Sequence, residues 1–152
     1  MIALNQRNRD FETANHKAPN YSLLTIAEVA EHFRLRPATI RTWVRVGRID
    51  ANRIGRDFRL TWADVWACEN APRPRGAAQE ARYRQSLITK ADISAGMKVS
   101  VRTVDRWILS GLPTRNVGAN VRMNPQDAQE WLKAEFRLLA PLFPYLTDEQ
   151  LS

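Results

Sequence analysis

The sequence is poor in the residues that build disulfides, metal centres and membrane spans. Of its 152 residues one is a cysteine, Cys68, and two are histidines, His16 and His32. A lone cysteine forms no internal disulfide, and with neither histidine near it in sequence a zinc site is not expected. We interpret Cys68 as a small apolar helix residue. No apolar run reaches the roughly 18 residues of a transmembrane helix, so no membrane partner is expected.

Motifs for catalysis and cofactor binding are also missing. The sequence contains no nucleophile elbow, no phosphate-binding loop and no grouping of histidine with carboxylates. We therefore expect no catalytic residues and no cofactor, and a protein that is not an enzyme. The first residues carry no apolar stretch of the signal-peptide kind, which favours a cytoplasmic, nucleoid-associated location.

Positive charge is abundant. Lysine and arginine number 23 against 16 acidic residues, for a formal net charge of +7. Such an excess favours a polyanionic partner. Charge alone does not choose among DNA, RNA and an acidic membrane surface.

An internal repeat organises the chain. The segment from Leu23 to Ile49 aligns with the segment from Leu87 to Pro113, which begins 64 residues later. Beyond this point the second repeat is one residue shorter. The aligned pairs are Thr25 with Thr89, Glu28 with Asp92, Thr39 with Thr103, Ile40 with Val104, Trp43 with Trp107, Gly47 with Gly111, Gly55 with Gly118, Arg59 with Arg122, and Asp64 with Asp127.

The repeat defines the predicted domains. Two small domains, 21–70 and 87–137, are separated by a basic linker at 71–86, whose Pro, Gly, Ala and Arg content is typical of a flexible or semi-extended segment. Residues 1–20 are predicted to be a disordered arm. Residues 138–152 form an apolar tail, in which Leu138, Leu139, Leu142, Phe143 and Leu146 either pack on the second domain or contact a partner.

Each repeat is predicted to fold as helix, turn, helix, hairpin and helix. Capping boxes begin the first helix at Thr25 and Glu28 and the third at Thr61 and Asp64. Pro37 suits the first position of the second helix. Apolar residues on that helix follow the period of a buried stripe, namely Ile40, Trp43, Val44 and Gly47. The second repeat offers the equivalent caps Thr89 with Asp92 and Asn124 with Asp127, and the stripe Val104, Trp107 and Ile108.

These motifs resemble those of excisionase-like winged helix-turn-helix domains, which are related to the MerR regulators and to AlpA-like phage regulators. The first helix has the T-x-x-E-V-A pattern of that family, and a glycine and an arginine of the wing precede the aspartate of the last helix, as in Gly55, Arg59 and Asp64. The resemblance covers roughly 100 residues. It implies a mainly α fold with small β-hairpin wings, arranged as two tandem winged helix-turn-helix domains.

The resemblance also implies a site. In that family the second helix enters the major groove of double-stranded DNA, and the wing touches the backbone or the minor groove. Arginine can pair with guanine edges and threonine with phosphate or a thymine methyl, while wing arginines meet phosphates. The residues carried over are Pro37, Ala38, Thr39, Arg41, Thr42, Arg45, Arg53, Arg56 and Arg59 in the first repeat, and Arg102, Thr103, Arg106 and Arg122 in the second.

The second repeat departs from the pattern. Asp105 stands where the first repeat has Arg41, and Leu109 replaces Arg45. An aspartate facing phosphates is repulsive, although it can accept a hydrogen bond from cytosine. The second repeat is therefore expected to bind DNA more weakly, to read a different half-site, or to have turned toward a protein.

Three functions follow from these expectations. The first is a sequence-specific transcriptional regulator of a phage or other mobile element. The second is a recombination directionality factor (an excisionase) that bends DNA at an attachment site. The third is an adaptor that binds DNA through the first domain and a protein, such as an integrase or RNA polymerase, through the second domain and the tail.

Overall fold

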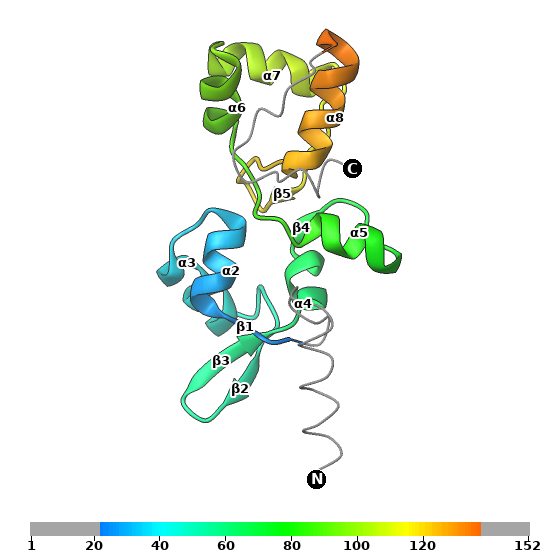
Figure 1. The fold of residues 1–152 in the computed structure, drawn as a ribbon. Coiled ribbons are helices and arrows are strands. Elements are labelled where there is room, and N and C mark those ends of the chain that lie inside the picture. Colours follow the sequence, from blue (N-terminus) through cyan, green and yellow to red (C-terminus); the bar gives the residue numbers. More distant parts are fainter. Residues whose placement is uncertain (1–21, 138–152) are drawn as a thin grey trace.

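A computed structural model of the chain describes residues 22–137. The expected N-terminal arm and the apolar tail at 138–152 lie outside the described residues. The fold is mainly helical, with two small antiparallel sheets, as the sequence predicts at that level (Figure 1). Within the described range every helix is too short or too polar to cross a bilayer.

The N-terminal half, residues 22–70, contains the predicted helix, helix, hairpin and helix in that order, with a short strand before and after them that the sequence does not predict. Its elements are β1 (Leu24–Thr25), α2 (Ile26–Phe33), α3 (Pro37–Arg45), β2 (Asn52–Ile54), β3 (Asp57–Leu60), α4 (Trp62–Ala67) and β4 (Glu69–Asn70). Strand β3 lies between β1 and β2 in an antiparallel sheet, with Leu24 opposite Leu60 and Asn52 opposite Arg59.

Local sequence signals explain where these helices begin and end. Thr25 and Glu28 form the predicted capping box of α2, and Thr61 and Asp64 form that of α4. Pro37 is the first residue of α3. Just beyond its end, Gly47 has φ +76°, a left-handed conformation that is common where a helix ends and that glycine adopts without strain.

The C-terminal half, residues 87–137, contains α6 (Lys90–Met97), α7 (Val101–Leu109), β5 (Asn116–Val117) and α8 (Pro125–Phe136). Helices α6 and α7 are as long as α2 and α3 and begin 64 residues later. Arg34 and Lys98, at the turns of the two helix pairs, share a left-handed φ of 58° and 55°. Capping by Thr89 and Asn124 is also as predicted.

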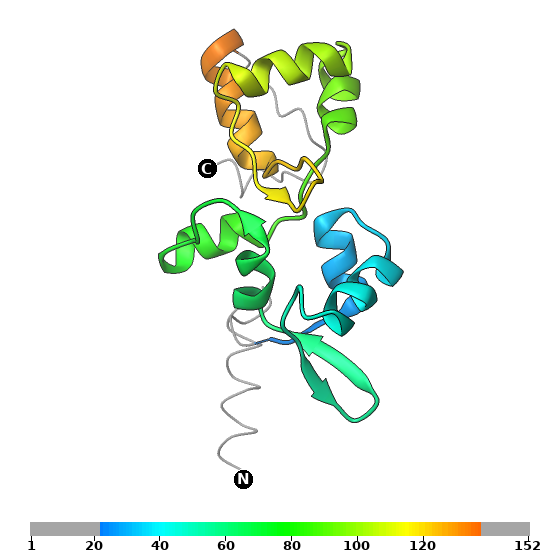
Figure 2. The same cartoon turned by 180° about the vertical axis from the view of Figure 1, so that it is seen from behind.

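The segment predicted to be a flexible linker is instead folded. Residues Gly76–Tyr83 form helix α5, which lies beside α4 and the base of α8 (Figure 2). Trp66 Nε1 donates a hydrogen bond to the Tyr83 carbonyl at 3.1 Å, and Tyr83 packs against the N-terminal core. These tertiary contacts order a segment whose composition alone favours extended conformations.

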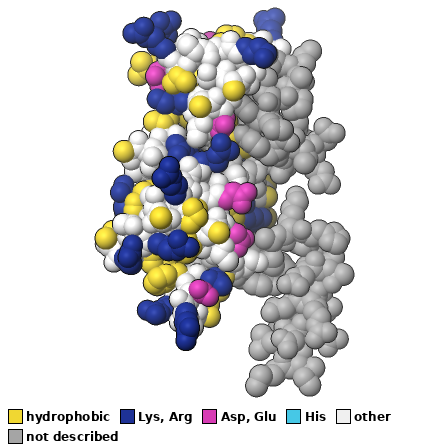
Figure 3. Space-filling model, turned by 90° about the vertical axis from the view of Figure 1, so that its left-hand side faces the viewer, with side chains coloured by type: hydrophobic (Ala, Val, Ile, Leu, Met, Phe, Trp, Pro, Cys, Tyr) yellow, Lys and Arg dark blue, Asp and Glu magenta, His cyan; other side chains and the backbone are white. Residues whose placement is uncertain are grey.

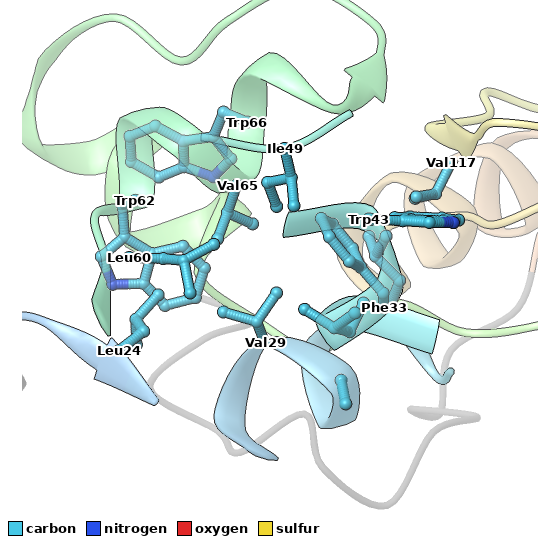
Figure 4. Packing of buried hydrophobic residues seen from close by; sticks show 13 residues of the cluster. Leu24, Val29, Phe33, Trp43, Ile49, Leu60, Trp62, Val65, Trp66 and Val117 are labelled. Atoms are coloured by element: carbon cyan, nitrogen blue, oxygen red, sulfur yellow. The ribbon is translucent and has the colours of Figure 1, made fainter. Parts of the chain in front are cut away.

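The hydrophobic core also crosses the predicted domain boundary. One cluster of buried residues fills the N-terminal half, and a second cluster lies among α6, α7 and α8. The first cluster includes two residues of the C-terminal half, Leu87 and Val117, and Val117 lies beside Trp43 (Figure 4). The C-terminal half therefore contributes two side chains to the N-terminal core, although the sequence predicts two separate domains.

The second predicted wing differs from the first. Strand β5 pairs with β4 of the N-terminal half, with Glu69 opposite Val117, and the turn at Gly118 closes on an isolated bridge between Val117 and Asn120. This turn lies against Arg48. The C-terminal hairpin is thus a contact between the halves, whereas the resemblance implies a wing that touches DNA.

Candidate nucleic-acid interface

Helix α3 has one buried face and one exposed face. Ile40 is fully buried and Trp43 is 9% exposed, so these two side chains fix the helix against the core. The predicted contact residues on the opposite face are exposed, except for the half-buried Thr39; they are Pro37, Ala38, Arg41, Thr42 and Arg45. The exposed face carries no acidic residue.

The polar groups of this face have few partners within the protein. Thr42 Oγ1 donates to the Ala38 carbonyl at 3.0 Å, and Arg45 Nη2 donates weakly to Thr42 Oγ1 at 3.4 Å. The Arg41 side chain forms no hydrogen bond or ion pair with any residue between 22 and 137. Its five guanidinium donors are therefore free to bind an external acceptor.

The β2–β3 hairpin adds further cations beside α3. Gly55, with φ +64°, makes the turn, and Arg56 is exposed at its tip. Arg53 lies 5.9 Å from the centre of the Phe58 ring and donates to the Gly55 carbonyl at 3.4 Å. Arg59 is more constrained, because Nη1 donates to the Phe58 carbonyl at 2.8 Å and Nη2 lies 3.9 Å from Asp57.

Charge is unevenly spread over the surface. Helix α3, the hairpin and α6 lie on one side of the molecule, at the left in Figure 1. On this side, lysine and arginine side chains occur from the hairpin to the C-terminal half, with few acidic side chains among them (Figure 3). An extended basic surface of this kind attracts polyanions.

Helix α7 exposes a mixed set of side chains. Arg102 and Arg106 are exposed and Thr103 is half-buried. Asp105, which replaces the arginine of α3, accepts a hydrogen bond from Lys90 Nζ at 2.8 Å. The positive charge of Lys90 therefore offsets part of the negative charge of Asp105 on this face.

Arg122 does not belong to the exposed surface predicted for it. Its Nε donates to the Phe33 carbonyl at 2.8 Å and its Nη2 to the Arg34 carbonyl at 3.0 Å. Burial, followed by the nearby charge of Arg34, lowers the pKa of Arg122. The side chain thus satisfies carbonyl groups at the end of α2. The DNA contact that the resemblance implies for Arg122 stays a prediction.

Sequence reasoning missed a buried ionic cluster between the halves. Glu69 is 5% exposed. One of its carboxylate oxygens accepts a hydrogen bond from Arg115 Nε at 2.5 Å, and the other lies 2.9 Å from His32 Nε2. Arg115 also donates to the Pro72 carbonyl and lies over the Tyr83 ring. Glu69 and Arg115 stand at unrelated places in the two repeats, so alignment of the repeats gives no signal for the pair.

Between residues 22 and 137 no three His, Cys, Asp or Glu side chains gather in a group that could hold a metal ion. Comparison of the chain with protein-family models, with curated proteins and with solved structures finds no match.

Proposed function

We propose that the chain binds double-stranded DNA through the exposed face of α3, with α3 as the recognition helix of a winged helix-turn-helix domain. The observation that carries this proposal is that one short helix has a buried apolar face and, opposite it, an exposed face with an arginine that has no partner in the described part of the chain. Ile40 and Trp43 anchor one face in the core, while Arg41 on the other face has no partner among the described residues. A helix fixed in this way can enter a major groove, where arginine recognises guanine.

The β2–β3 hairpin supports the same proposal as a wing. It exposes Arg53 on β2 and Arg56 at its tip, and both side chains suit contacts to phosphate. Such contacts position a protein on the duplex without reading its sequence. Together, α3 and the hairpin supply both kinds of contact that specific binding requires.

We further propose that α6 and α7 form a second helix-turn-helix unit. The equal lengths and spacing of the two helix pairs support this interpretation, as do the left-handed residues at their turns. The resemblance to excisionase-like and AlpA-like proteins then favours a transcriptional regulator of a mobile element. An excisionase that bends DNA would use the same surface, and a footprint distinguishes the two: a promoter site indicates regulation, and repeats beside an integrase site indicate excision.

One observation favours the adaptor alternative. Leu109 on α7 is 89% exposed, and Val101, two turns earlier on the same helix, is 41% exposed. Apolar side chains this exposed gain little from DNA phosphates and suit a protein partner. The C-terminal half also lacks a free wing, because its hairpin pairs with β4.

Binding of the full chain to labelled duplex DNA at increasing salt concentration tests the proposal. If 6–10 phosphates are neutralised, affinity falls by roughly 10³–10⁵ between 50 and 200 mM salt. A selected sequence should bind more tightly than random DNA of the same length. Absence of duplex binding at low salt, or binding that ignores salt, would overturn the proposal.

A further inference from the structure

The two halves interlock through backbone and core. Strand β5 pairs with β4, and Val117 of that strand is 1% exposed within the N-terminal core. Leu87 N donates to the His32 carbonyl at 2.8 Å, which fixes the entry to the C-terminal half. The sheet and the core would both have to break before one half could rotate against the other.

Helix α5 braces the same joint from one side. Arg82 makes two hydrogen bonds of 2.9 Å to the carboxylate of Glu130 and also binds Asp127, both on α8. Asn124, the cap of α8, donates back to the Arg82 carbonyl at 2.9 Å. Bidentate ion pairs of this kind hold both distance and angle.

A second set of contacts attaches the turn between α2 and α3 to the C-terminal half. Arg122 binds the Phe33 and Arg34 carbonyls at the end of α2. Arg34 Nη2 in turn lies 3.3 Å from Asp92 on α6. The turn that precedes α3 is therefore attached to the helix that precedes α7, and both turns lie on the same side of the molecule (Figures 1 and 2).

We propose that one chain reads a two-part DNA site whose parts are separated by a single fixed number of base pairs. This inference rests on the proposed function and adds what the joint implies for the target. Helices α3 and α7 belong to one rigid body, so they meet the duplex at one separation and one angle. A flexible tether between the halves would accept many separations.

The geometry of DNA makes this rigidity measurable. Each inserted base pair moves the second part of the site by about 3.4 Å along the axis and turns it by about 35°. Five inserted pairs place it on the opposite face of the duplex. A rigid chain then keeps only the contacts of α3, whereas a tethered pair of domains can still follow the groove.

The site itself comes from selection of random duplexes by the full chain. The expected product is a motif in two unlike parts with one spacing, unlike because Asp105 of α7 replaces Arg41 of α3. Affinity is then measured on duplexes with zero, one, two, five and ten base pairs inserted between the parts. We expect a loss of about tenfold with one inserted pair and about 10²-fold with five, the scale by which a second linked contact raises affinity.

A matched variant separates the joint from the helix surface. The side chains of Arg102 and Arg106 are exposed and make no hydrogen bond or ion pair with the rest of residues 22–137. Arg102→Ala with Arg106→Ala therefore removes the cations of α7 and leaves the joint intact. This variant should bind all spacings equally, at the level of the wild-type chain on the five-pair insertion.

Each remaining outcome is decisive. If the wild-type chain bound every spacing with equal affinity, the proposal of a two-part site with one fixed spacing would be overturned, while DNA binding by α3 would stand. A selected motif with one part only would do the same and would favour the adaptor. Failure to select any duplex would reject the proposed function itself.

Discussion

Arg115 and Glu69 form a buried ion pair across the boundary between the two sequence repeats, with Arg115 Nε 2.5 Å from Glu69 Oε1. Their side chains are 3% and 0% exposed. Glu69 also meets His32, so that each of its carboxylate oxygens has a partner. The pair lies where β4 joins β5, and it therefore links the stability of one half to that of the other.

The first prediction concerns removal of this carboxylate. Glu69→Ala leaves Arg115 as an uncompensated buried charge, and we expect a loss of about 3–5 kcal/mol in the free energy of unfolding. Asp105→Ala is the matched control, because its ion pair with Lys90 lies at the surface and such pairs contribute about 0–1 kcal/mol. Urea denaturation measures both. Equal small losses in the two variants would show that the Glu69 pair is open to water.

The second prediction concerns cooperativity. Because Val117 lies in the N-terminal core and α5 joins both halves, the chain should unfold in one transition, although the sequence predicts independent domains. Trp107→Phe with Trp131→Phe leaves Trp43, Trp62 and Trp66 as fluorescent probes of the N-terminal half. Their transition should coincide with the loss of helical circular dichroism over the whole chain. Two separated midpoints would mean that the joint is weak.

Local signals in the sequence predict much of this fold. Capping threonines, Pro37 and the apolar stripe on α3 act within a few residues of one another, so pattern alone locates the helices of both halves. The same signals identify the exposed face of α3, because it is the face opposite Ile40 and Trp43.

The joint could not be predicted in this way. Arg122 aligns with Arg59 and even makes the same short bond, 2.8 Å, to the carbonyl of its preceding residue. The difference is that α2 lies close to Arg122, so that its Nε also donates to the Phe33 carbonyl and links the two halves. Helix α5 was missed for a similar reason, since its contacts to Trp66 and α8 lie far away in sequence.

The third prediction concerns Cys68. Burial, then the neighbouring negative charge of Glu69, raises the pKa of its thiol from 9.0 to about 11. The thiolate is the form that reacts, so alkylation of the folded chain should be slow at pH 8 and rise through a midpoint near pH 11. Because folding raises this pKa, the contribution of the Cys68 thiol to the free energy of unfolding is fully present below pH 9 and is lost as the pH rises through about 11. Cys68→Ser is the blank, and alkylation with a midpoint near 9 would show an exposed thiol.

The fourth prediction concerns the wing. Arg53→Ala with Arg56→Ala should weaken binding to specific and random duplexes by the same factor and reduce the salt slope by about two, one for each phosphate contact. Lys133→Ala is the control, because α8 lies on the other side of the molecule from α3 and the hairpin (Figures 1 and 2). If net charge alone governed binding, Lys133→Ala would reduce the salt slope by about one, half the effect of the double variant.

The last prediction contrasts Arg41 with Arg122, two arginines that the sequence places together at a DNA interface. Arg41→Ala removes a side chain without partners among the described residues, so the free energy of unfolding should change by less than about 0.5 kcal/mol. Binding to the selected site should weaken by about 1–3 kcal/mol, with a smaller loss on random DNA.

Arg122→Ala should behave in the opposite way. It leaves the Phe33 and Arg34 carbonyls without their donors, and an unsatisfied, partly buried acceptor costs about 1–3 kcal/mol. Stability should therefore fall, while the folded variant keeps the salt slope of the wild-type chain because no phosphate contact has been removed. Equal losses for Arg41→Ala on selected and random DNA would reassign Arg41 to phosphate. A reduced salt slope for Arg122→Ala would return Arg122 to the DNA interface, and would mean that the joint opens when the chain binds.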